Sequence, residues 1–402
     1  MPRIIYYNIY RVKGDDAFFQ DMMGLAVQKT LFEHFGETPE WRRVTGNFRH
    51  GMREVLTVAF LAQASGARSV RQIAVWAKEN EGRLRDAGLG LPYGVPSRQC
   101  LDRVFRKMPP AILRALERRW STGLRNLEAG SVLAVDGKAL KHASADGVHT
   151  PCVVSAWACD GGFVVGETKT AEKSNEITAI PELLDDIAAD IRGCVVTIDA
   201  AGCQKNIARK VVDVCRADYV FGLKGNQKNL HDEFLELFDT CQKAYPDRFR
   251  AFATVEKNGG RHEERKCVQT DFVEWFPEVG EWKGLRSVIM VEEHRITNKG
   301  PSHDRRLYAS SLPLDAERAL GCVRKHWGVE NGLHWTLDVI FREDDCRSRA
   351  DNAAENLATF RHLLVGVLRQ KGKELGLSVG SVAFKGVCSR EFAFSLVFGD
   401  AA

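Results

Sequence analysis

Residues 130–244 alternate short apolar runs with amphipathic stretches, and this order constrains the fold more than any other feature of the 402-residue chain. The runs SVLAVDGKAL and CVVSAWACDGGFVVGETKT come first, and the Asp160-Gly161-Gly162 turn in the second run predicts a hairpin. Helical stretches then alternate with CVVTIDA and DYVFGLKGN. The order β-β-β-α-β-α-β-α predicts a meander of three strands followed by parallel strands with helical crossovers, which is an α/β fold with a mixed sheet.

The chain changes character on either side of this region. Residues 15–128 consist mostly of helical stretches broken by Gly and Pro clusters, which predicts an all-helical N-terminal domain at 1–129. A β-rich stretch at about 245–313 interrupts the α/β pattern of the second domain, 130–402. A strong amphipathic helix lies near the C-terminus.

The charge is distributed unevenly between these two parts. Residues 1–130 contain 21 Lys+Arg against 13 Asp+Glu, whereas the remainder contains 36 against 40. A basic N-terminal part is suited to binding a polyanion, but a solvated, Arg-rich helical surface explains the same charge equally well.

Composition excludes several other classes of protein. The longest apolar runs are too short to span a bilayer, and the first residues contain no long apolar segment of a signal peptide. The eleven Cys form no C-x-x-C pair, which indicates reduced thiols in the cytoplasm. The Gly-rich phosphate loop G-x-x-x-x-G-K-[ST] is also absent.

Two aspartates stand where apolar strands end. The strand predicted in SVLAVDGKAL ends at Asp136-Gly137, and the strand predicted in CVVTIDA ends at Asp199. Taken singly, each can be an ordinary turn former or helix cap. Taken together, they are expected to be neighbours, because the meander places the first strand at the sheet centre and the crossover sets the Asp199 strand beside it. Two adjacent carboxylates are unfavourable unless a cation holds them.

A third carboxylate is available in KHWGVENGLHWTLDVIFRED, residues 325–344. Helical period places Glu330 on one stripe with His326, His334 and Asp338. A helix rich in Trp is a stiff mount, which favours Glu330 as the third ligand. Three carboxylates can hold two Mg²⁺ ions that activate a water or a 3′-OH for attack at phosphorus. The rival carboxylates are Glu343, Asp344, Asp345 and Glu355.

The same stripe also allows a zinc site. His326, Glu330 and His334 lie on one helical face, and zinc accepts such ligands. However, H-E-x-x-H is absent, and two His flanked by Trp can pack and hydrogen-bond without a metal. The zinc interpretation is therefore the weaker of the two.

These residues carry a resemblance to a known family. The chain resembles bacterial insertion-sequence transposases of the DDE type, specifically the H-repeat-associated group. The matching segments are LAVDGKAL at 133–140, EKSNEITAIPELL at 172–184, VVTIDAAGCQKNIA at 195–208, YVFGLKGNQ at 219–227, HWGVENGLHWTLDVIFRED at 326–344 and NAAENLATFRHLL at 352–364.

The resemblance implies an RNase H-like catalytic domain at 130–402, with the β-rich insertion between the second Asp and the Glu. It implies the catalytic and metal-binding triad Asp136, Asp199 and Glu330, with two Mg²⁺ ions for which Mn²⁺ can substitute. It further implies cleavage and strand transfer of double-stranded DNA at element ends by a homodimer in the bacterial cytoplasm, associated with the nucleoid. Alternatives are a non-mobile or non-catalytic DNA-binding descendant and a metal-dependent nuclease of the same fold.

The chain departs from related transposases outside this group in one respect. Those proteins carry a Tyr, an Arg and a Lys around the Glu, whereas Val323, His326 and Leu337 occupy these positions here. The roles of the three residues therefore do not carry over. Arg324, Lys325 and His326 are candidates to supply DNA-facing charge instead.

Other basic residues are candidates for contacts with phosphate. Each of them can equally be an ordinary surface residue. They are Lys224 and Lys228 after a strand, Arg261 and Arg265 along the insertion hairpin, and Arg98 and Arg103 in the helix expected after the Ser97 cap.

Overall fold

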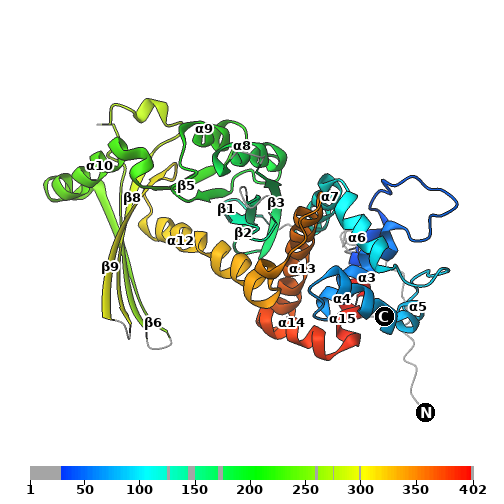
Figure 1. The fold of residues 1–402 in the computed structure, drawn as a ribbon. Helices are drawn as coiled ribbons and strands as arrows, with labels where there is room; N and C mark the ends of the chain where they lie inside the picture. The colour runs from blue at the N-terminus through cyan, green and yellow to red at the C-terminus, as the bar shows by residue number, and fades with distance from the viewer. Residues whose placement is uncertain are drawn as a thin grey trace, which may run out of the picture.

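The computed structural model describes residues 29–124, 127–143, 150–170, 175–258, 261–274, 276–297 and 300–399. These residues build one large mixed sheet and a set of helices that gather around one half of it (Figure 1). The strands are β1 (Val132–Ala139), β2 (Cys152–Ala158), β3 (Phe163–Lys169), β4 (Val195–Ile198), β5 (Asp218–Leu223), β6 (Phe249–Asn258), β7 (Arg261–Thr270), β8 (Ser287–Thr297) and β9 (Gly300–Ser310).

The helices fall before, within and after the sheet in the chain. The N-terminal ones are α2 (Leu31–Gly36), α3 (Met52–Ala64), α4 (Val70–Glu79), α5 (Glu81–Asp86), α6 (Arg98–Lys107) and α7 (Pro110–Gly123). Those between strands are α8 (Glu176–Ile187), α9 (Lys205–Asp213), α10 (Lys228–Glu236) and α11 (Gln242–Ala244). The C-terminal ones are α12 (Ala316–His326), α13 (Ala353–Leu375), α14 (Val379–Cys388) and α15 (Arg390–Phe398).

The strand order is β3-β2-β1-β4-β5-β9-β8-β7-β6. Strands β1, β2 and β3 form the expected antiparallel meander, and β1, β4 and β5 are parallel. Helices α8 and α9 cover one face of this part, and α12 crosses the other (Figure 1). Parallel strands covered on both faces become continuous apolar runs, which explains the buried VVTI of β4. The expected RNase H-like mixed sheet with helices on both faces is confirmed.

The β-rich insertion is part of the same sheet. Strand β9 pairs antiparallel with β5, and β8, β7 and β6 follow as long antiparallel neighbours. Figure 1 shows the far ends of these strands reaching away from the helices, while α12 packs against β6 and β7 nearer the centre of the sheet. The stretch expected at about 245–313 is therefore present, but it lengthens the central sheet at its edge.

The last helices of the chain pack against the N-terminal helical part. Helix α13 contacts α6 and α7, and α15 contacts α2 and α3. The Nδ2 atom of Asn356 on α13 donates to the carbonyl oxygens of Phe105 and Met108 on and after α6, at 2.8 and 2.9 Å. The ring of Phe360 lies among Phe35, Phe60 and Phe105. The N-terminal helical region is confirmed, whereas the division of the chain at 129/130 stays a prediction.

Within the described part of the chain, every helix is either too short or too polar to cross a lipid bilayer.

Glycine at position 222 of β5 allows the chain to approach closely at the end of β4. A Cβ atom there would lie 3.2 Å from the backbone nitrogen of Ala200 and 3.5 Å from the carbonyl carbon of Asp199. We predict that Gly222→Ala lowers the free energy of unfolding by about 1–3 kcal/mol, because rigid backbone must give way. Urea unfolding measures the change. Gly225→Ala, which meets nothing within 4 Å, is the matched control, and equal effects of the two would contradict the prediction.

Candidate active site

Asp136 and Asp199 lie side by side on neighbouring parallel strands: Asp136 is within β1, just past the end of its pairing with β4, and Asp199 directly follows β4. The register pairs Val132 with Val195 and continues to Val135 with Ile198. Asp136 and Asp199 are the next residue of each strand. Because side chains alternate along a strand, both carboxylates fall on the side of the sheet that α12 covers.

The turn after β4 holds Asp199 firmly in place. Its Oδ1 atom accepts hydrogen bonds from the backbone N–H groups of Ala201 and Gly202, at 3.0 and 3.3 Å. The Nδ2 atom of Asn226 donates to the carbonyl oxygen of Ala200 at 2.6 Å, which ties the turn to the segment after β5. One carboxylate oxygen of Asp199 is thus used for structure.

Asp136 is an unusually basic carboxylate. Burial raises its pKa to about 7; the Gly137 N–H acts against this shift, and the charges of Glu176, Asp199 and Glu330 add to it. The shift shows that three other acids act electrostatically on Asp136. Strongly perturbed acids that gather at the end of a sheet are typical of functional sites.

A neutral histidine stands beside Asp136. The Nδ1 atom of His334 lies 3.5 Å from an Asp136 carboxylate oxygen. Burial, then Lys138 and His362, lower the pKa of His334 to about 3. His334 therefore supplies no positive charge to the carboxylates, and its Nε2 atom is buried without a hydrogen-bond partner among the described residues.

Glu330 lies on a stretch that is no regular α-helix. Helix α12 ends at His326, and two π-helical segments follow, η5 (Val329–His334) and η6 (Thr336–Ile340). Segment η5 packs against β1, and the Glu330 side chain is exposed there. Such π turns occur frequently at functional sites.

The rival carboxylates are already paired, whereas Glu330 forms no ion pair with another described residue. Paired acids are poorer candidates for a metal site because their charge is already balanced. The pairs are Glu343 with Arg361, Asp344 with Lys138 and Lys141, Asp345 with Arg342, and Glu355 with Arg114 and Lys169.

The predicted stripe of residues contacts the sheet at three points. The Nδ1 atom of His326 lies 3.1 Å from Thr197 Oγ1 on β4, and His334 contacts Asp136. Asp338 accepts from Lys138 Nζ at 2.8 Å. Burial lowers the pKa of His326, against opposing effects of Asp199 and Thr197. His326 thus hydrogen-bonds to the sheet, and His334 packs against Asp136.

The sequence did not identify Lys138 as a residue of the candidate active site. It is 8% exposed and links β1 to Asp338 on η6 and to Asp344 beyond it. Its sequence signal is its position two residues after Asp136, on the same face of the strand. By fixing η6 against β1, Lys138 also fixes the preceding π segment that carries Glu330.

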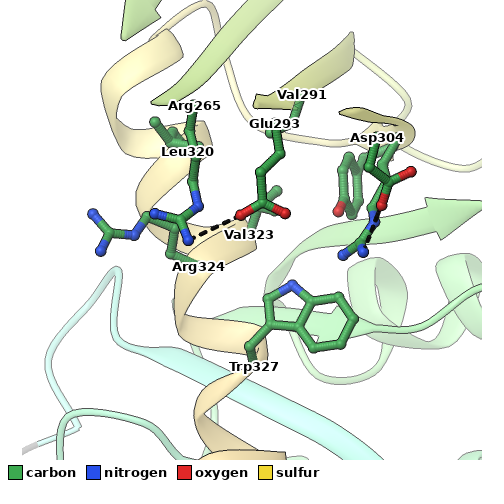
Figure 2. Close-up of a pocket in the computed structure, with 10 residues that line it drawn as sticks. Arg265, Val291, Glu293, Asp304, Leu320, Val323, Arg324 and Trp327 are labelled. Atoms are coloured by element: carbon green, nitrogen blue, oxygen red, sulfur yellow. Dashed lines mark hydrogen bonds and ion pairs between the residues drawn. The ribbon is translucent and has the colours of Figure 1, made fainter. Parts of the chain in front are cut away.

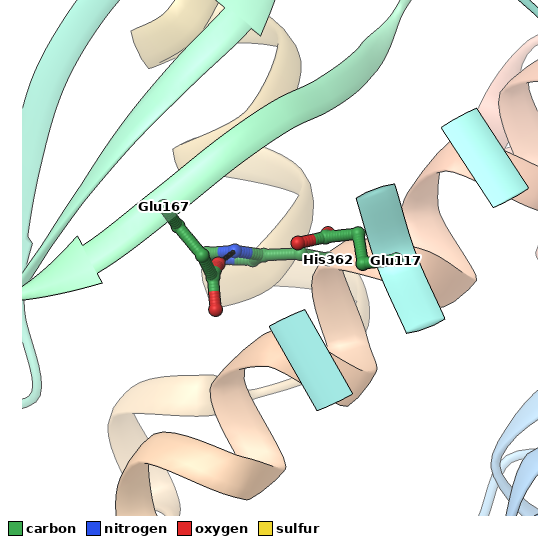
Figure 3. Close-up of side chains that lie close together, drawn as sticks. All are labelled: Glu117, Glu167 and His362. Carbon is green, nitrogen blue, oxygen red and sulfur yellow. Dashed lines mark hydrogen bonds and ion pairs between the residues drawn. The ribbon is translucent and has the colours of Figure 1, made fainter. Parts of the chain in front are cut away.

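A second acidic cluster lies in the interior, between α7, β3 and α13 (Figure 3). Among the described residues, Glu117, Glu167 and His362 are the one set of three potential metal ligands whose atoms lie within 4.8 Å of one another. Glu167 accepts hydrogen bonds from His362 and Thr359. Burial opposes the protonation of His362, but Glu167 outweighs it and raises its pKa.

Glu117 completes this cluster as an uncharged acid. Burial and then the charge of Glu167 raise its pKa well above the ordinary 4.5. A protonated His362, an ionised Glu167 and a neutral Glu117 balance their charges without any metal. We therefore interpret this cluster as a structural network that joins α7 and α13 to the sheet.

Two of the predicted DNA contacts, Arg265 in the insertion and Arg324 on α12, pair with carboxylates, and Figure 2 shows the pair of Arg265 with Glu293. Arg265 is 15% exposed and pairs with Glu256, Glu263 and Glu293, while Arg324 pairs with Glu256 at 2.6 Å. Their contacts with DNA stay predictions, and the side chain of Arg261 lies outside the described residues.

The other lysines predicted to contact DNA differ in whether an ion pair already holds them. Lys325 pairs with Asp160 at 2.8 Å. Lys224 and Lys228 are exposed on either side of the short turn after β5, at the sheet end where Asp199 lies, and neither pairs with a described residue. These two lysines are therefore available to phosphate.

The N-terminal helices form a basic hollow. Ser97 caps α6 as expected, accepting from Cys100 N at 3.2 Å, and Arg98 follows it at the surface. Arg103 lines a cavity with other cations and with aromatic side chains. The lining includes Arg42, Arg43, Arg49, Lys107, Trp41, Phe48 and Tyr93.

Comparison with known proteins agrees with this arrangement. Residues 128–365 match the family described as Transposase DDE domain, and residues 32–121 match the one described as DDE_Tnp_1-associated. The chain belongs to the DDE transposase family. The H repeat-associated protein YhhI of Escherichia coli (strain K12) is 35% identical over 350 residues, which are 85% of this transposase and 90% of YhhI. YbfL of the same strain shares the same identity and coverage.

Among solved structures, the piggyBac transposase synaptic complex with hairpin DNA aligns with a TM-score of 0.41 and 13% identity. The alignment covers 92% of this transposase and 76% of that chain. A likeness this low supports no argument about mechanism.

The interior cluster gives a prediction about pH. Unfolded Glu117 ionises above about pH 4.5, whereas the folded group stays protonated to higher pH, so stability falls as the pH rises between the two pKa values. Each pH unit in this interval costs up to about 1.4 kcal/mol. Glu117→Gln cannot ionise, so its melting temperature relative to the wild type is expected to rise from pH 5 to pH 8. The exposed Glu317→Gln is the control, and a difference independent of pH would refute the assignment.

Proposed function

We propose that this transposase cuts phosphodiester bonds at the ends of its element and joins the resulting 3′-OH to target DNA, with Asp136, Asp199 and Glu330 as metal-binding carboxylates. The observation that carries the proposal is the register of β1 and β4, which sets Asp136 beside Asp199 on the face that α12 covers. There the charges of Glu176, Asp199 and Glu330 add to the raised pKa of the half-buried Asp136, and the histidine beside it is neutral. A group of acids without an internal cation is suited to binding one from solution.

The donor set fits two Mg²⁺ ions. Carboxylate oxygens are the ligands that hard divalent cations prefer, and Mn²⁺ accepts the same ligands. When bound, such ions assist the nucleophile and stabilise the leaving oxygen at phosphorus. Asp136, Asp199 and Glu330 would hold them.

The residues of the chain supply orientation. The N–H groups of Ala201 and Gly202 hold one Asp199 oxygen, so that the other keeps a fixed direction. His334 stands against Asp136 and limits its rotation. Lys138 holds η6 on β1 and so keeps the Glu330 segment near the sheet. Metal ligands held in this way need little rearrangement before reaction.

Double-stranded DNA is the proposed substrate, bound by surfaces at two places. Lys224 and Lys228 lie at the sheet end where Asp199 lies and are available for phosphate contacts. In the N-terminal hollow, Arg43, Arg49 and Arg103 are exposed and have no ion pair with another described residue. Because an element has two ends, we propose that a homodimer acts on the DNA, in the cytoplasm with the nucleoid.

Asp136→Asn should abolish catalysis without loss of DNA binding, because it removes a metal ligand and leaves the basic surfaces intact. We expect Mg²⁺-dependent nicking of a plasmid that carries the DNA flanking the gene to fall at least ~10³-fold, which corresponds to about 4 kcal/mol. The exposed Asp186→Asn is the control. Retained nicking would overturn the assignment, and nicking without joined products would indicate a nuclease.

Arg49→Ala combined with Arg103→Ala should weaken DNA binding and reduce its dependence on salt. If both side chains contact phosphates, the slope of log K against log salt should decrease in magnitude by roughly 2. Fluorescence anisotropy with a labelled duplex measures the slope. Arg209→Ala, an exposed arginine on α9, is the control, and an unchanged slope in the double variant would rule out the hollow as a DNA surface.

A further inference from the structure

We infer that Glu176 is a fourth metal-binding carboxylate of the active site, an inference that rests on the metal site proposed above. Glu176 is the first residue of α8 and follows the end of β3 by only a few positions. Helix α8 packs on β2 and β3, the two strands that form the meander with β1. Its first residue therefore lies near the strand that carries Asp136.

The position of the Glu176 carboxylate is defined by its contact with β1. A Cβ atom added to Gly137 would lie 2.1 Å from Oε1 of Glu176. The carboxylate thus occupies the space directly over the residue that follows Asp136. Gly137 is not among the glycines with positive φ, so its backbone conformation does not require glycine. A larger residue at position 137 would instead displace the Glu176 carboxylate.

The other contact of Glu176 is weak. The Cys152 thiol on β2 donates to Oε1, with a Sγ–oxygen distance of 3.6 Å. A neutral thiol cannot balance the charge of a half-buried carboxylate. Among the residues that the structure describes, neither lysine, arginine nor histidine forms an ion pair with Glu176. Like Asp136, Glu176 therefore has no described cation that balances its charge. The charge of Glu176 acts on Asp136 together with those of Asp199 and Glu330.

Charge balance supports a role in metal binding. Asp136, Asp199 and Glu330 supply three negative charges when ionised, and Glu176 supplies a fourth. Two divalent cations carry four positive charges, so the four carboxylates would neutralise the ions that this mechanism requires. A fourth oxygen donor also suits cations that take six or more ligands.

The simpler role for Glu176 is to stabilise the start of α8. An acid in the first turn of a helix does so through the helix dipole. That role requires only a position in the first turn. It does not explain why the half-buried carboxylate lies over Gly137, the neighbour of Asp136 on β1, or why its charge acts on Asp136. The two roles predict different results for metal affinity, which separates them.

Glu176→Gln tests the inference in the full chain without DNA. We expect Mn²⁺ titration, followed by calorimetry or by the electron paramagnetic resonance of free Mn²⁺, to show affinity weakened by about tenfold or more. The Mg²⁺ concentration for half-maximal nicking should rise, while duplex binding stays unchanged. Glu182→Gln on the same helix is exposed and should behave as wild type. Unchanged Mn²⁺ affinity in Glu176→Gln would overturn the inference.

Two further variants keep the outcome clear. Glu176→Asp retains the charge but has a shorter side chain. Weakened Mn²⁺ binding with an unchanged melting temperature supports a role for Glu176 as a metal ligand. A lower melting temperature with normal Mn²⁺ binding supports the helix-start role and refutes the ligand role. Asp136→Asn tests the site itself. If it also binds Mn²⁺ normally, the proposed metal site fails as a whole. If Asp136→Asn loses binding and the Glu176 variants do not, the fourth ligand alone fails.

Discussion

The parallel pairing of β1 with β4 is the constraint on which the rest of the active site depends. Its register brings Asp136 and Asp199 to the same end and the same face of the sheet. Partial burial of Asp136 weakens the screening of its charge by water, and its pKa rises to about 7, while Asp199 lies exposed beside it. The apolar strands that carry the two residues are deeply packed, which fixes the positions of the carboxylates. In the proposed function, this concentration of negative charge attracts divalent cations.

The third carboxylate reaches the site by a longer route. Strands β6–β9 extend the sheet before the chain returns through α12, which crosses the face where the aspartates lie. A regular helix beyond His326 would repeat its contacts every 3.6 residues, but the π segments change that period. Lys138 then fixes the end of this stretch to β1 through Asp338. The position of Glu330 therefore depends on contacts on both sides of it.

The sequence allowed the central sheet and the two aspartates to be predicted because both follow from local pattern. Apolar runs end at Asp136 and Asp199, and crossover rules make their strands neighbours. The packing of α13 against α6 was not predictable, since it depends on Asn356 meeting carbonyl groups about 250 residues earlier in the chain. The approach of Glu176 to Gly137 is equally non-local. At the start of a helix, a glutamate looks like a capping residue until the opposing strand is known.

The interior cluster and the acids at the strand ends differ in charge balance, which is why only the second group is suited to binding a metal. In the interior cluster, Glu117 retains a proton and His362 gains one beside Glu167, so the charges balance within the protein. At the strand ends, burial keeps His334 neutral, and Lys138 is directed to Asp338 and Asp344. No described cation is left to offset the carboxylates there. The cluster at the strand ends is also partly open at Glu330, so that ions and DNA can reach it. The interior cluster is enclosed by α7, β3 and α13. Ligand distance alone would select the interior cluster, but charge balance and access select the strand ends.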